Sequence, residues 1–419
     1  MTTKLTDLPR AGGEFARGAA PLDGRHVVLG VTGSIAAFKA ADLCSKLRQA
    51  GATVEVVMTP AAAQFVTPLT FQSLSGRPVV VDMFTATEPE AHVEVARRAD
   101  IMVIAPATAD CLANLAAGQT PDMVTLTALA TTAPVLVAPA MDNQMWDHPA
   151  TQANVAVLRD RGVGFVGPAR GRLASGRSGQ GRLVEVPAIV GAVAAALGQA
   201  EGDMRGLQVV VSAGGTQEPI DPVRFVGNRS SGKMGFAIAE AARDRGATVT
   251  LVTGPVAIDT PIGITREDVA TVAEMLAALR EATVECDALV MAAAPADFRP
   301  ETAANQKIKK TADGDGLDLR LAKTPDILGS LEGGGIRVGF AAETENLAAN
   351  AVDKLRRKRL DFIVANDVTK AGSGFATDTN QVTFFFPDGR VEELPLMAKY
   401  AVAHAIWDRV LAARAAAPA

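Results

Sequence analysis

Short apolar runs alternate with helical patterns along almost the whole chain, and this alternation most constrains the fold. In the first half the runs are HVVLGV (26–31), VEVVM (54–58), IMVIAPA (101–107) and VLVAPA (135–140). In the second half they are LQVVVSAGG (207–215), VTLVTG (249–254), ALVMAAAP (288–295), DFIVAND (361–367) and VTFFFP (382–387). Such alternation is typical of βαβ units, which form parallel sheets covered by helices. We therefore predict an α/β fold with mainly parallel sheets.

The chain divides into two such regions near residue 203. Its 419 residues exceed the size of one ordinary domain. Between the two sets of runs, AIVGAVAAALG (188–198) has the pattern of a closing helix that ends at about Leu197, and a short polar linker follows it. We therefore predict two Rossmann-like domains, over residues 25–200 and 206–415, after a flexible tail over residues 1–24.

Composition and net charge limit the classes of molecule that the protein is expected to bind. Hydrophobic residues make up 48% of the chain but aromatic residues only 4%, so the core is built mainly from small aliphatic side chains. Such side chains suit buried parallel strands. The formal net charge of −5 gives no general attraction for nucleic acid or for an anionic membrane. We expect small-molecule substrates, with no nucleic acid and no membrane as partners.

Three features of the sequence indicate the cellular compartment of the protein. No stretch is apolar over the roughly 18 residues that spanning a bilayer requires. Residues 1–24 contain no apolar segment of the kind found in a secretory signal. Cys44, Cys111 and Cys286 are far apart and form no C-x-x-C pair, which favours a reducing compartment. We expect a cytoplasmic protein.

The first domain opens with a strand, a turn and a helix, VVLGVTGSIAAFKA (27–40). Ser34 has the character of a helix N-cap, and Ile35, Phe38 and Leu43 give the helix an apolar face. Backbone N–H groups and a hydroxyl at a helix start can bind phosphate, although an ordinary capped helix has the same pattern. The dinucleotide spacing G-x-G-x-x-G is absent, so a mononucleotide such as FMN is at least as plausible a ligand.

Four further segments of this domain have the composition of a ligand site. The first places His92 just ahead of a helix, where a lone histidine is more often structural. APATADCLANLAAG (105–118) and APAMDNQMWDHPAT (138–151) each leave a buried strand, and the second carries Asp142. GRLASGRSGQGRL (171–183) is too rich in glycine for a core and suits a lid.

Together, VTGSIAAFKA, His92, APATAD and PAMDNQMW resemble the flavin-dependent cysteine decarboxylases that include phosphopantothenoylcysteine decarboxylase, over most of residues 26–190. The resemblance implies a flavodoxin-like flavoprotein domain. It implies His92 as the acid or base near the substrate thiol, with Asp142 in the substrate motif and Ser175 in a clamp. It further implies FMN as the cofactor, held by Gly33, Ser34, Thr59, Thr108, Ala109 and Asp110.

Two positions depart from that family's pattern. Asp142 stands where the family has asparagine, and an ionised aspartate repels a carboxylate that an amide would bind. Ser175 stands where relatives carry a proton-donating cysteine, and a hydroxyl is a far weaker acid than a thiol. Asp142 could still serve if it were protonated or turned away, whereas Ser175 puts the last, reductive step of a decarboxylase cycle in question.

The second domain opens in a similar way. A strand leads into SAGGTQEPIDPVRFVGNRSSGKMG (212–235), and its last residues place hydroxyls, a glycine and Lys233 before a helix. Such a cluster is a good anion cradle, with a polar capped turn as the alternative. It is not a P-loop, because Met234 follows Lys233 where that motif requires serine or threonine.

Polar and aromatic residues follow the later strands of this domain. Asp297 lies past a buried strand, at the edge where α/β folds bind ligands, and Phe340 offers a stacking face. Lys354 and Lys358 lie one turn apart on the helix AVDKLRRKRL (351–360). A run of Lys and Arg is more often a solvated helix face, but this one leads directly into another buried strand.

The runs GGTQEPIDPVRFVGNRSSGKMG, KIKK, GFAAET and AND closely resemble the bacterial phosphopantothenate–cysteine ligases, over nearly all of residues 206–410. The resemblance implies a C-terminal ligase domain that uses CTP, bound by Asp297, Lys307, Pro325, Asp326, Ile327, Leu328, Phe340, Lys354 and Lys358. It implies Mg2+ on the triphosphate, with Asp297 as a candidate metal ligand. Asn228 would contact the acyl-cytidylate intermediate.

The whole chain thus resembles the fused enzymes of coenzyme A synthesis in which the second domain makes the substrate of the first. The expected substrates are 4'-phosphopantothenate, cysteine and CTP, and the expected assembly is a homo-oligomer, a dodecamer by the resemblance. Asp142 and Ser175 leave an alternative open, a ligase whose N-terminal domain is a degenerate flavin-binding assembly or regulatory module. A nicotinamide dehydrogenase is disfavoured, because neither domain has the dinucleotide spacing.

Overall fold

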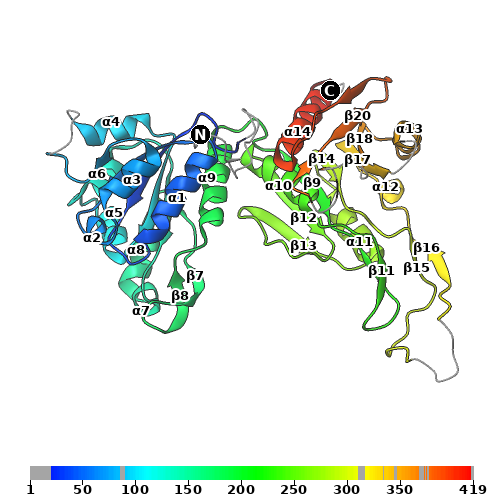
Figure 1. The fold of residues 1–419 in the computed structure, drawn as a ribbon, viewed down its shortest axis with the longest axis horizontal. Coiled ribbons are helices and arrows are strands. Elements are labelled where there is room, and N and C mark those ends of the chain that lie inside the picture. The colour runs from blue at the N-terminus through cyan, green and yellow to red at the C-terminus, as the bar shows by residue number, and fades with distance from the viewer. Residues whose placement is uncertain are drawn as a thin grey trace, which may run out of the picture.

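The computed structural model describes residues 20–84, 90–309, 317–333, 335–343, 347–367, 372, 374 and 377–416. Two α/β units lie side by side, the first coloured blue to green and the second green to red (Figure 1). Each has a mainly parallel sheet, as the alternation of strands and helices predicts. None of the described helices is long and apolar enough to cross a bilayer.

The first unit has a six-stranded parallel sheet in the order β3-β2-β1-β4-β5-β6. Its strands are β1 (His26–Val31), β2 (Thr53–Met58), β3 (Val79–Val80), β4 (Ile101–Ala107), β5 (Val135–Pro139) and β6 (Gly164–Phe165). Its helices are α1 (Ala37–Gln49), α2 (Ala62–Phe65), α3 (Pro68–Ser75), α4 (Ala91–Arg98), α5 (Ala109–Ala117), α6 (Met123–Ala130), α7 (Asn143–Trp146), α8 (Pro149–Asp160) and α9 (Val186–Glu201). From β1 the strands are added in one direction up to β3 and then in the opposite direction from β4 to β6. Ligands of such sheets bind at this point of reversal, between β1 and β4.

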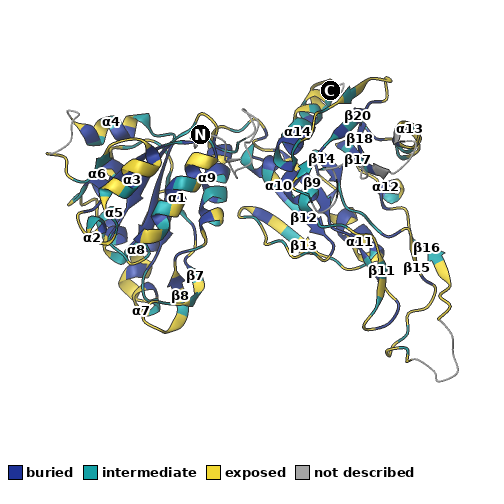
Figure 2. Cartoon of the chain, viewed as in Figure 1, coloured by how far each residue is buried: buried dark blue, intermediate teal, exposed yellow. Residues whose placement is uncertain are grey.

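Each face of this sheet has its own apolar cluster. Along β1, Val27 and Leu29 pack with residues of α1, α3 and α9, whereas Val28 packs with residues of α5, α6 and α8. The alternation follows the two-residue period of a strand. All residues of β4 are buried, and the dark blue centre of the unit in Figure 2 shows the same pattern.

The second unit has an eight-stranded sheet in the order β13-β12-β9-β14-β17-β18-β20-β21. These strands are β9 (Gln208–Ala213), β12 (Thr248–Thr253), β13 (Ile264–Asp268), β14 (Ala288–Met291), β17 (Ile336–Glu343), β18 (Phe362–Asp367), β20 (Val382–Phe385) and β21 (Val391–Glu393). The helices are α10 (Lys233–Asp244), α11 (Val272–Ala282), α12 (Ile327–Ser330), α13 (Leu347–Lys358) and α14 (Lys399–Ala416). The strands β20 and β21 run antiparallel, and no helix lies in the described residues between β18 and β20.

Short antiparallel pairs complete the structure. β7 (Ala169–Arg172) and β8 (Ser178–Arg182) form a hairpin on the first unit, and β19 (Thr379–Asn380) pairs with β22 (Met397–Ala398) on the second. The pairs β10 (Gln217–Pro219) with β11 (Phe225–Gly227), and β15 (Phe298–Pro300) with β16 (Leu321–Lys323), lie on an arm that projects from the second unit (Figure 1). The segment predicted as a lid over 171–183 is therefore largely an ordered hairpin.

The two units meet where α9 packs against α10. A Cβ atom on Gly198 would lie 2.5 Å from the carbonyl oxygen of Asp244, so the helix backbones approach as closely as only glycine allows. The Asp244 carboxylate accepts hydrogen bonds from Arg243 Nε and from the Tyr400 hydroxyl, both at 2.8 Å. The buried carboxylate at the junction is thus paired, as burial of a charge requires.

Two predicted boundaries differ from the structure. Residues 20–24 do not belong to a flexible tail, because Leu22 is fully buried and its N–H donates to the Ala50 carbonyl at 2.9 Å. Residues 1–19 of the predicted tail lie outside the described residues. The closing helix continues past Leu197 to Glu201, because its last turn packs against α10.

The start of α1 also differs from the prediction. The helix begins at Ala37, and the Ser34 Oγ accepts from the Ala36 N–H at 3.2 Å within the preceding turn rather than capping the helix. Ile35 and Phe38 do not face the core, since their exposed fractions are 59% and 62%. The buried face of α1 is formed instead by Ala37, Ala40, Leu43, Cys44 and Leu47.

Candidate functional site

The residues predicted to hold FMN follow three neighbouring strands of the first sheet. Thr32, just after β1, joins two of them: its hydroxyl donates to the Pro106 carbonyl at 2.6 Å and accepts from the Thr108 N–H at 3.2 Å. Thr108 caps α5 by accepting from Cys111 N at 3.2 Å, and Thr59, after β2, accepts from Ala62 N at 3.1 Å. The carboxyl ends of β1, β2 and β4 therefore bring together Gly33, Ser34, Thr59 and Thr108–Asp110.

The turn between β1 and α1 fits an anionic ligand. Among the described residues, no acceptor receives a hydrogen bond from the backbone N–H groups of Ser34 and Ile35. Gly33 allows the turn to pack closely on the start of α2, since a Cβ on it would lie 2.5 Å from the Ala61 Cβ. Unpaired N–H groups at the start of a helix are the donors that a phosphate binds.

Beside this turn lies a cavity of about 350 Å3 under the β7–β8 hairpin. Its lining comes from the start of α1, from Ala140–Asp142 after β5, and from the hairpin, including Ser175. Ile35 and Phe38 line it, which explains why these apolar side chains are not in the core. The structure thus brings Ser34, Asp142 and Ser175 to one cavity of the size of a small-molecule site.

Asp142 and Ser175 are direct partners. The Ser175 hydroxyl donates to Asp142 Oδ2 at 2.7 Å, and the Gln144 N–H donates to Asp142 Oδ1 at 3.1 Å. Arg177 Nη1 lies 3.8 Å from Asp142 Oδ1. The hydrogen bond from Ser175, followed by that from Gln144, lowers the pKa of the Asp142 carboxyl. Asp142 is therefore ionised near neutral pH and acts as an acceptor.

His92 does not reach this pair within one chain. It lies in the first turn of α4, and α4 and α7 lie at opposite ends of the first unit (Figure 1). His92 Nδ1 and Asn143 Oδ1 on α7 are buried atoms for which the described part of the chain provides no hydrogen-bond partner. Buried polar atoms without partners are uncommon and point to an absent ligand or contact.

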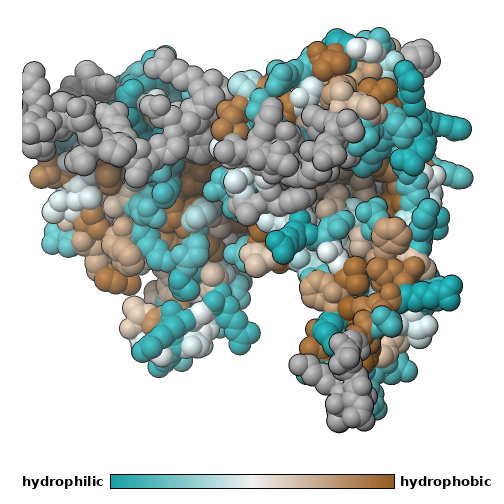
Figure 3. Space-filling model, turned by 45° about the vertical axis from the view of Figure 1, so that its right-hand side comes forward, coloured by the Kyte–Doolittle hydropathy of each residue, from teal (hydrophilic) through white to brown (hydrophobic). Residues whose placement is uncertain are grey.

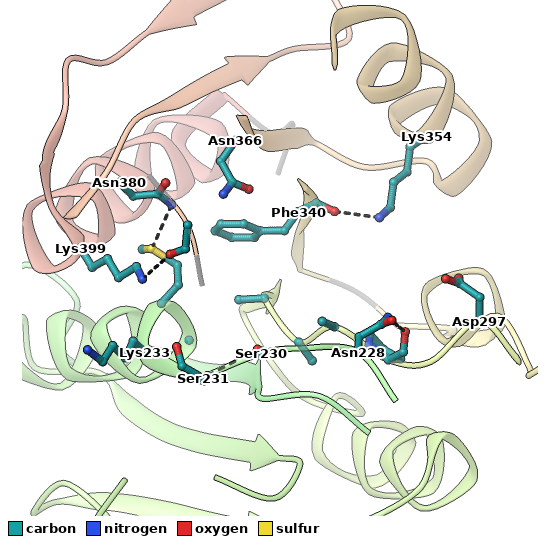
Figure 4. Close-up of a pocket in the computed structure, with 18 residues that line it drawn as sticks. Asn228, Ser230, Ser231, Lys233, Asp297, Phe340, Lys354, Asn366, Asn380 and Lys399 are labelled. Atoms are coloured by element: carbon teal, nitrogen blue, oxygen red, sulfur yellow. Dashed lines mark hydrogen bonds between the residues drawn. The ribbon is translucent and has the colours of Figure 1, made fainter. Parts of the chain in front are cut away.

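In the second unit, two adjoining cavities follow β14 and β17, with volumes of about 340 Å3 and 410 Å3. They share Ala293, Pro295, Asp297, Phe340 and Lys354. The first cavity reaches the start of α10, where Ser230, Ser231 and Lys233 lie (Figure 4). The second extends to α12 and α13.

Most residues predicted to bind CTP line the second cavity. They are Asp297, Pro325, Asp326, Ile327, Leu328, Phe340, Lys354 and Lys358. Lys307 lines neither cavity, because it is exposed on the segment that leads from β15 towards β16. Asn228 lines the first cavity, and its Nδ2 donates to the Pro295 carbonyl at 2.9 Å.

The two predicted lysines of α13 point to the same cavity from successive turns. Lys354 Nζ donates to the Phe340 carbonyl at 2.7 Å. Lys358 Nζ pairs with the Asp326 carboxylate, which also accepts from the Gly329 N–H at 3.1 Å at the start of α12. Burial lowers the pKa of Lys358. Two ammonium groups therefore converge on a cavity that reaches Asp297.

Lys399 lines the first cavity although no sequence pattern singled it out. It is the first residue of α14, its exposed fraction is only 5%, and it lies on the same side of the cavity as Lys233 (Figure 4). Asn366 and Asn380 also line this cavity. The only signal in the sequence was one lysine at the start of an otherwise apolar helix, MAKYAVAHAIW.

The described residues contain no cluster of three or more His, Cys, Asp or Glu that could hold a metal ion. Among the described residues, Asp297 is the carboxylate that lines both cavities, and Asp326 and Asp353 line the second cavity alone. A single carboxylate suits Mg2+, which is usually held by one or two carboxylates together with the phosphates of a substrate.

Comparison with known proteins covers both units. The Flavoprotein family model matches residues 17–198, and the model of the DNA/pantothenate metabolism flavoprotein C-terminal domain matches residues 204–413. The solved C-terminal domain of a coenzyme A biosynthesis bifunctional protein CoaBC is 38% identical, covers 50% of this chain and 96% of its own, and has a TM-score of 0.43.

Full-length relatives match the order of the two units. The coenzyme A biosynthesis bifunctional protein CoaBC of Bacillus subtilis is 46% identical over 398 residues, which cover 93% of this chain and 98% of the relative. Its counterpart in Escherichia coli K12 is 44% identical over 397 residues, which cover 93% of this chain and 97% of the relative. The chain belongs to the CoaBC family of bifunctional proteins of coenzyme A biosynthesis.

Proposed function

We propose that the second unit ligates cysteine to 4'-phosphopantothenate with CTP, and that the first unit decarboxylates the product to 4'-phosphopantetheine with FMN. One observation carries the proposal for the ligase: the residues predicted to bind CTP, except Lys307, line a single cavity that adjoins the anion cradle before α10. Two phosphate-bearing substrates need two such neighbouring sites.

The ligase chemistry requires an activated carboxylate. Attack of the phosphopantothenate carboxylate on the α-phosphate of CTP forms an acyl-cytidylate and releases pyrophosphate, and the amine of cysteine then displaces CMP. Negative charge develops on phosphate oxygens, and Lys354 and Lys358 project towards them from α13. Mg2+ would add charge neutralisation on the triphosphate, with Asp297 as its protein ligand.

For the decarboxylase, FMN supplies the redox chemistry that makes the loss of CO2 feasible. The free N–H groups of Ser34 and Ile35 would hold its phosphate, with Thr59 and Thr108 beside them. Asp142 and Ser175 form the wall of the cavity under the hairpin, where the cysteine end of the substrate would lie. His92 would move the proton of the substrate thiol.

We propose a homo-oligomer, because one chain does not bring His92 to that cavity. An interface between copies would join His92 of one chain to Asp142 and Ser175 of another. The arm of the second unit supports further association: Val223, Phe225, Phe298 and Leu321 are exposed there, and Figure 3 shows apolar surface gathered on it. Large exposed apolar patches mark association sites.

A second candidate is a ligase whose first unit only binds flavin for assembly or regulation. The ionised Asp142 favours it, since that carboxylate would face a substrate carboxylate. To separate the two, the purified protein is incubated with 4'-phosphopantothenate, cysteine, CTP and Mg2+, and products are followed by mass spectrometry. Accumulation of 4'-phosphopantetheine supports both activities, accumulation of 4'-phosphopantothenoylcysteine supports the ligase alone, and absence of any cysteine adduct overturns the proposal.

A further inference from the structure

Lys399 is a buried lysine whose ammonium group bonds to backbone carbonyls. Its Nζ donates to the Gly374 carbonyl at 2.9 Å and to the Thr377 carbonyl at 2.5 Å. Its backbone N–H donates to the Asp378 carbonyl at 3.0 Å. One residue at the start of α14 thus holds three carbonyls of the chain that precedes β19, and charged donors make such bonds stronger than neutral ones.

Asp378, whose backbone carbonyl accepts from Lys399, also forms a salt bridge with a second lysine through its side chain. Asp378 Oδ1 accepts from Lys233 Nζ at 2.7 Å. Lys233 opens α10 and lines the first cavity with Ser230 and Ser231. Lys399 therefore connects through Asp378 to the cradle where the ligase would bind an anion, although Lys233 and Lys399 are far apart in the sequence.

The charges around Lys399 make this link sensitive to pH. Burial and, to a smaller extent, the neighbouring Lys233 ammonium lower the pKa of Lys399 to about 8, while the Asp378 carboxylate acts in the opposite direction. A rise in pH through 8 therefore removes a proton from Lys399 while an ordinary lysine stays charged. The neutral amine forms weaker bonds to the carbonyls of Gly374 and Thr377.

We infer that Lys399 is a positioning residue of the ligase site. Its protonated ammonium group fixes Thr377 and Asp378, and Asp378 in turn places Lys233 at the anion cradle. Lys399 acts through these residues rather than on the substrate. The inference rests on the ligase function proposed above and adds a residue to it.

The test follows the first half-reaction, so that the amine of cysteine does not contribute to the pH profile. Exchange of labelled pyrophosphate into CTP is measured with 4'-phosphopantothenate from pH 6.5 to 10, and kcat/KM for 4'-phosphopantothenate is taken, because this ratio reports groups of the free enzyme. We expect the wild-type value to fall as the pH rises through about 8 and to level off at about one tenth of its value at pH 7, the loss also expected for Lys399→Met.

Three variants distinguish a positioning role of Lys399 in the ligase site from a purely structural role. Lys399→Arg keeps the charge and is expected to lose the decline near pH 8, since arginine does not titrate in this range. Lys399→Met is expected to lower kcat/KM at pH 7 about tenfold, chiefly through KM. Asp378→Asn removes the charge that raises the pKa of Lys399 and is expected to move the decline to lower pH.

Lys46→Met is the matched control, because Lys46 lies on α1 of the first unit and its ammonium group donates to the nearby Gln49. We expect it to leave the profile unchanged. A decline at pH 8 that persists in Lys399→Arg overturns the inference, and so does a Lys399→Met variant with the wild-type profile. If Lys399→Met fails to fold, the other two variants decide. A wild-type protein without exchange contradicts the ligase function instead, so the two failures are distinguishable.

Discussion

The Ser175 hydroxyl donates a hydrogen bond to Asp142 Oδ2 at 2.7 Å, and this bond ties the tip of the β7–β8 hairpin to the residue before α7. The two positions at which the sequence departs from the decarboxylase pattern are thus partners of each other. The bond also lowers the pKa of Asp142, so the pair does not serve as a proton donor near neutral pH. A change at one residue therefore acts on the other.

Asp142→Asn is expected to lower the KM for 4'-phosphopantothenoylcysteine about fivefold, the effect of removing one solvated like charge at about 4 Å. The amide keeps an oxygen that can accept from Ser175, so the hairpin stays in place. Initial rates of CO2 release measure the effect. Asp147→Asn, at the other end of α7, is the control, and an unchanged or higher KM in Asp142→Asn would count against a substrate carboxylate near residue 142.

Lys354→Met and Lys358→Met are each expected to raise the KM for CTP about tenfold or more, because each removes a charged donor from the second cavity. The measurement is pyrophosphate release at varied CTP and saturating 4'-phosphopantothenate. Arg356→Met is the matched control, since Arg356 lies on the same helix, is exposed and does not line the cavity. Equal effects in all three variants would show a loss of helix stability rather than of CTP binding.

Co-expression of two inactive variants tests whether the decarboxylase site lies between copies. His92→Asn and Asp142→Lys are each expected to abolish CO2 release alone. Mixed oligomers of the two are expected to regain activity, because some interfaces then join an intact His92 to an intact Asp142. Native mass spectrometry checks that mixed oligomers form. Mixed oligomers that stay inactive would place His92 and Asp142 in the same site of one chain, contrary to their separation here.

Gly198→Ala is expected to lower the free energy of unfolding by about 1–3 kcal/mol, because its Cβ would lie 2.5 Å from the backbone oxygen of Asp244, which cannot move aside freely. Gly191→Ala on the same helix is the control, since its Cβ would lie 3.5 Å from the Arg243 guanidinium, an ordinary contact. Calorimetry of both variants measures the difference. A stable Gly198→Ala variant would mean that α9 and α10 do not pack this closely in solution.

The sequence was most informative where local pattern decides structure. Apolar runs between helices predicted the strands, and the rule that ligands bind at the carboxyl ends of strands predicted the position of Asp297 and Phe340 in one cavity. Spacing along one helix was enough to place Lys354 and Lys358 together.

What the sequence did not predict depends on contacts between distant segments. Ile35 and Phe38 were predicted only as part of the apolar face of a helix, and they line a cavity that the hairpin over residues 169–182 completes. Lys399 meets Lys233 because α14 and α10 pack together, which no local pattern records. The Asp142–Ser175 bond likewise joins two segments whose register depends on the fold of the hairpin.

The most direct test of the account uses cysteine labelled with carbon-13 at its carboxyl carbon. The pure protein receives this cysteine with 4'-phosphopantothenate, CTP and Mg2+, and the label is followed over time by mass spectrometry. We expect the label to appear first in 4'-phosphopantothenoylcysteine and then in CO2, while unlabelled 4'-phosphopantetheine accumulates. Label that remains in 4'-phosphopantothenoylcysteine, or never leaves free cysteine, would contradict it.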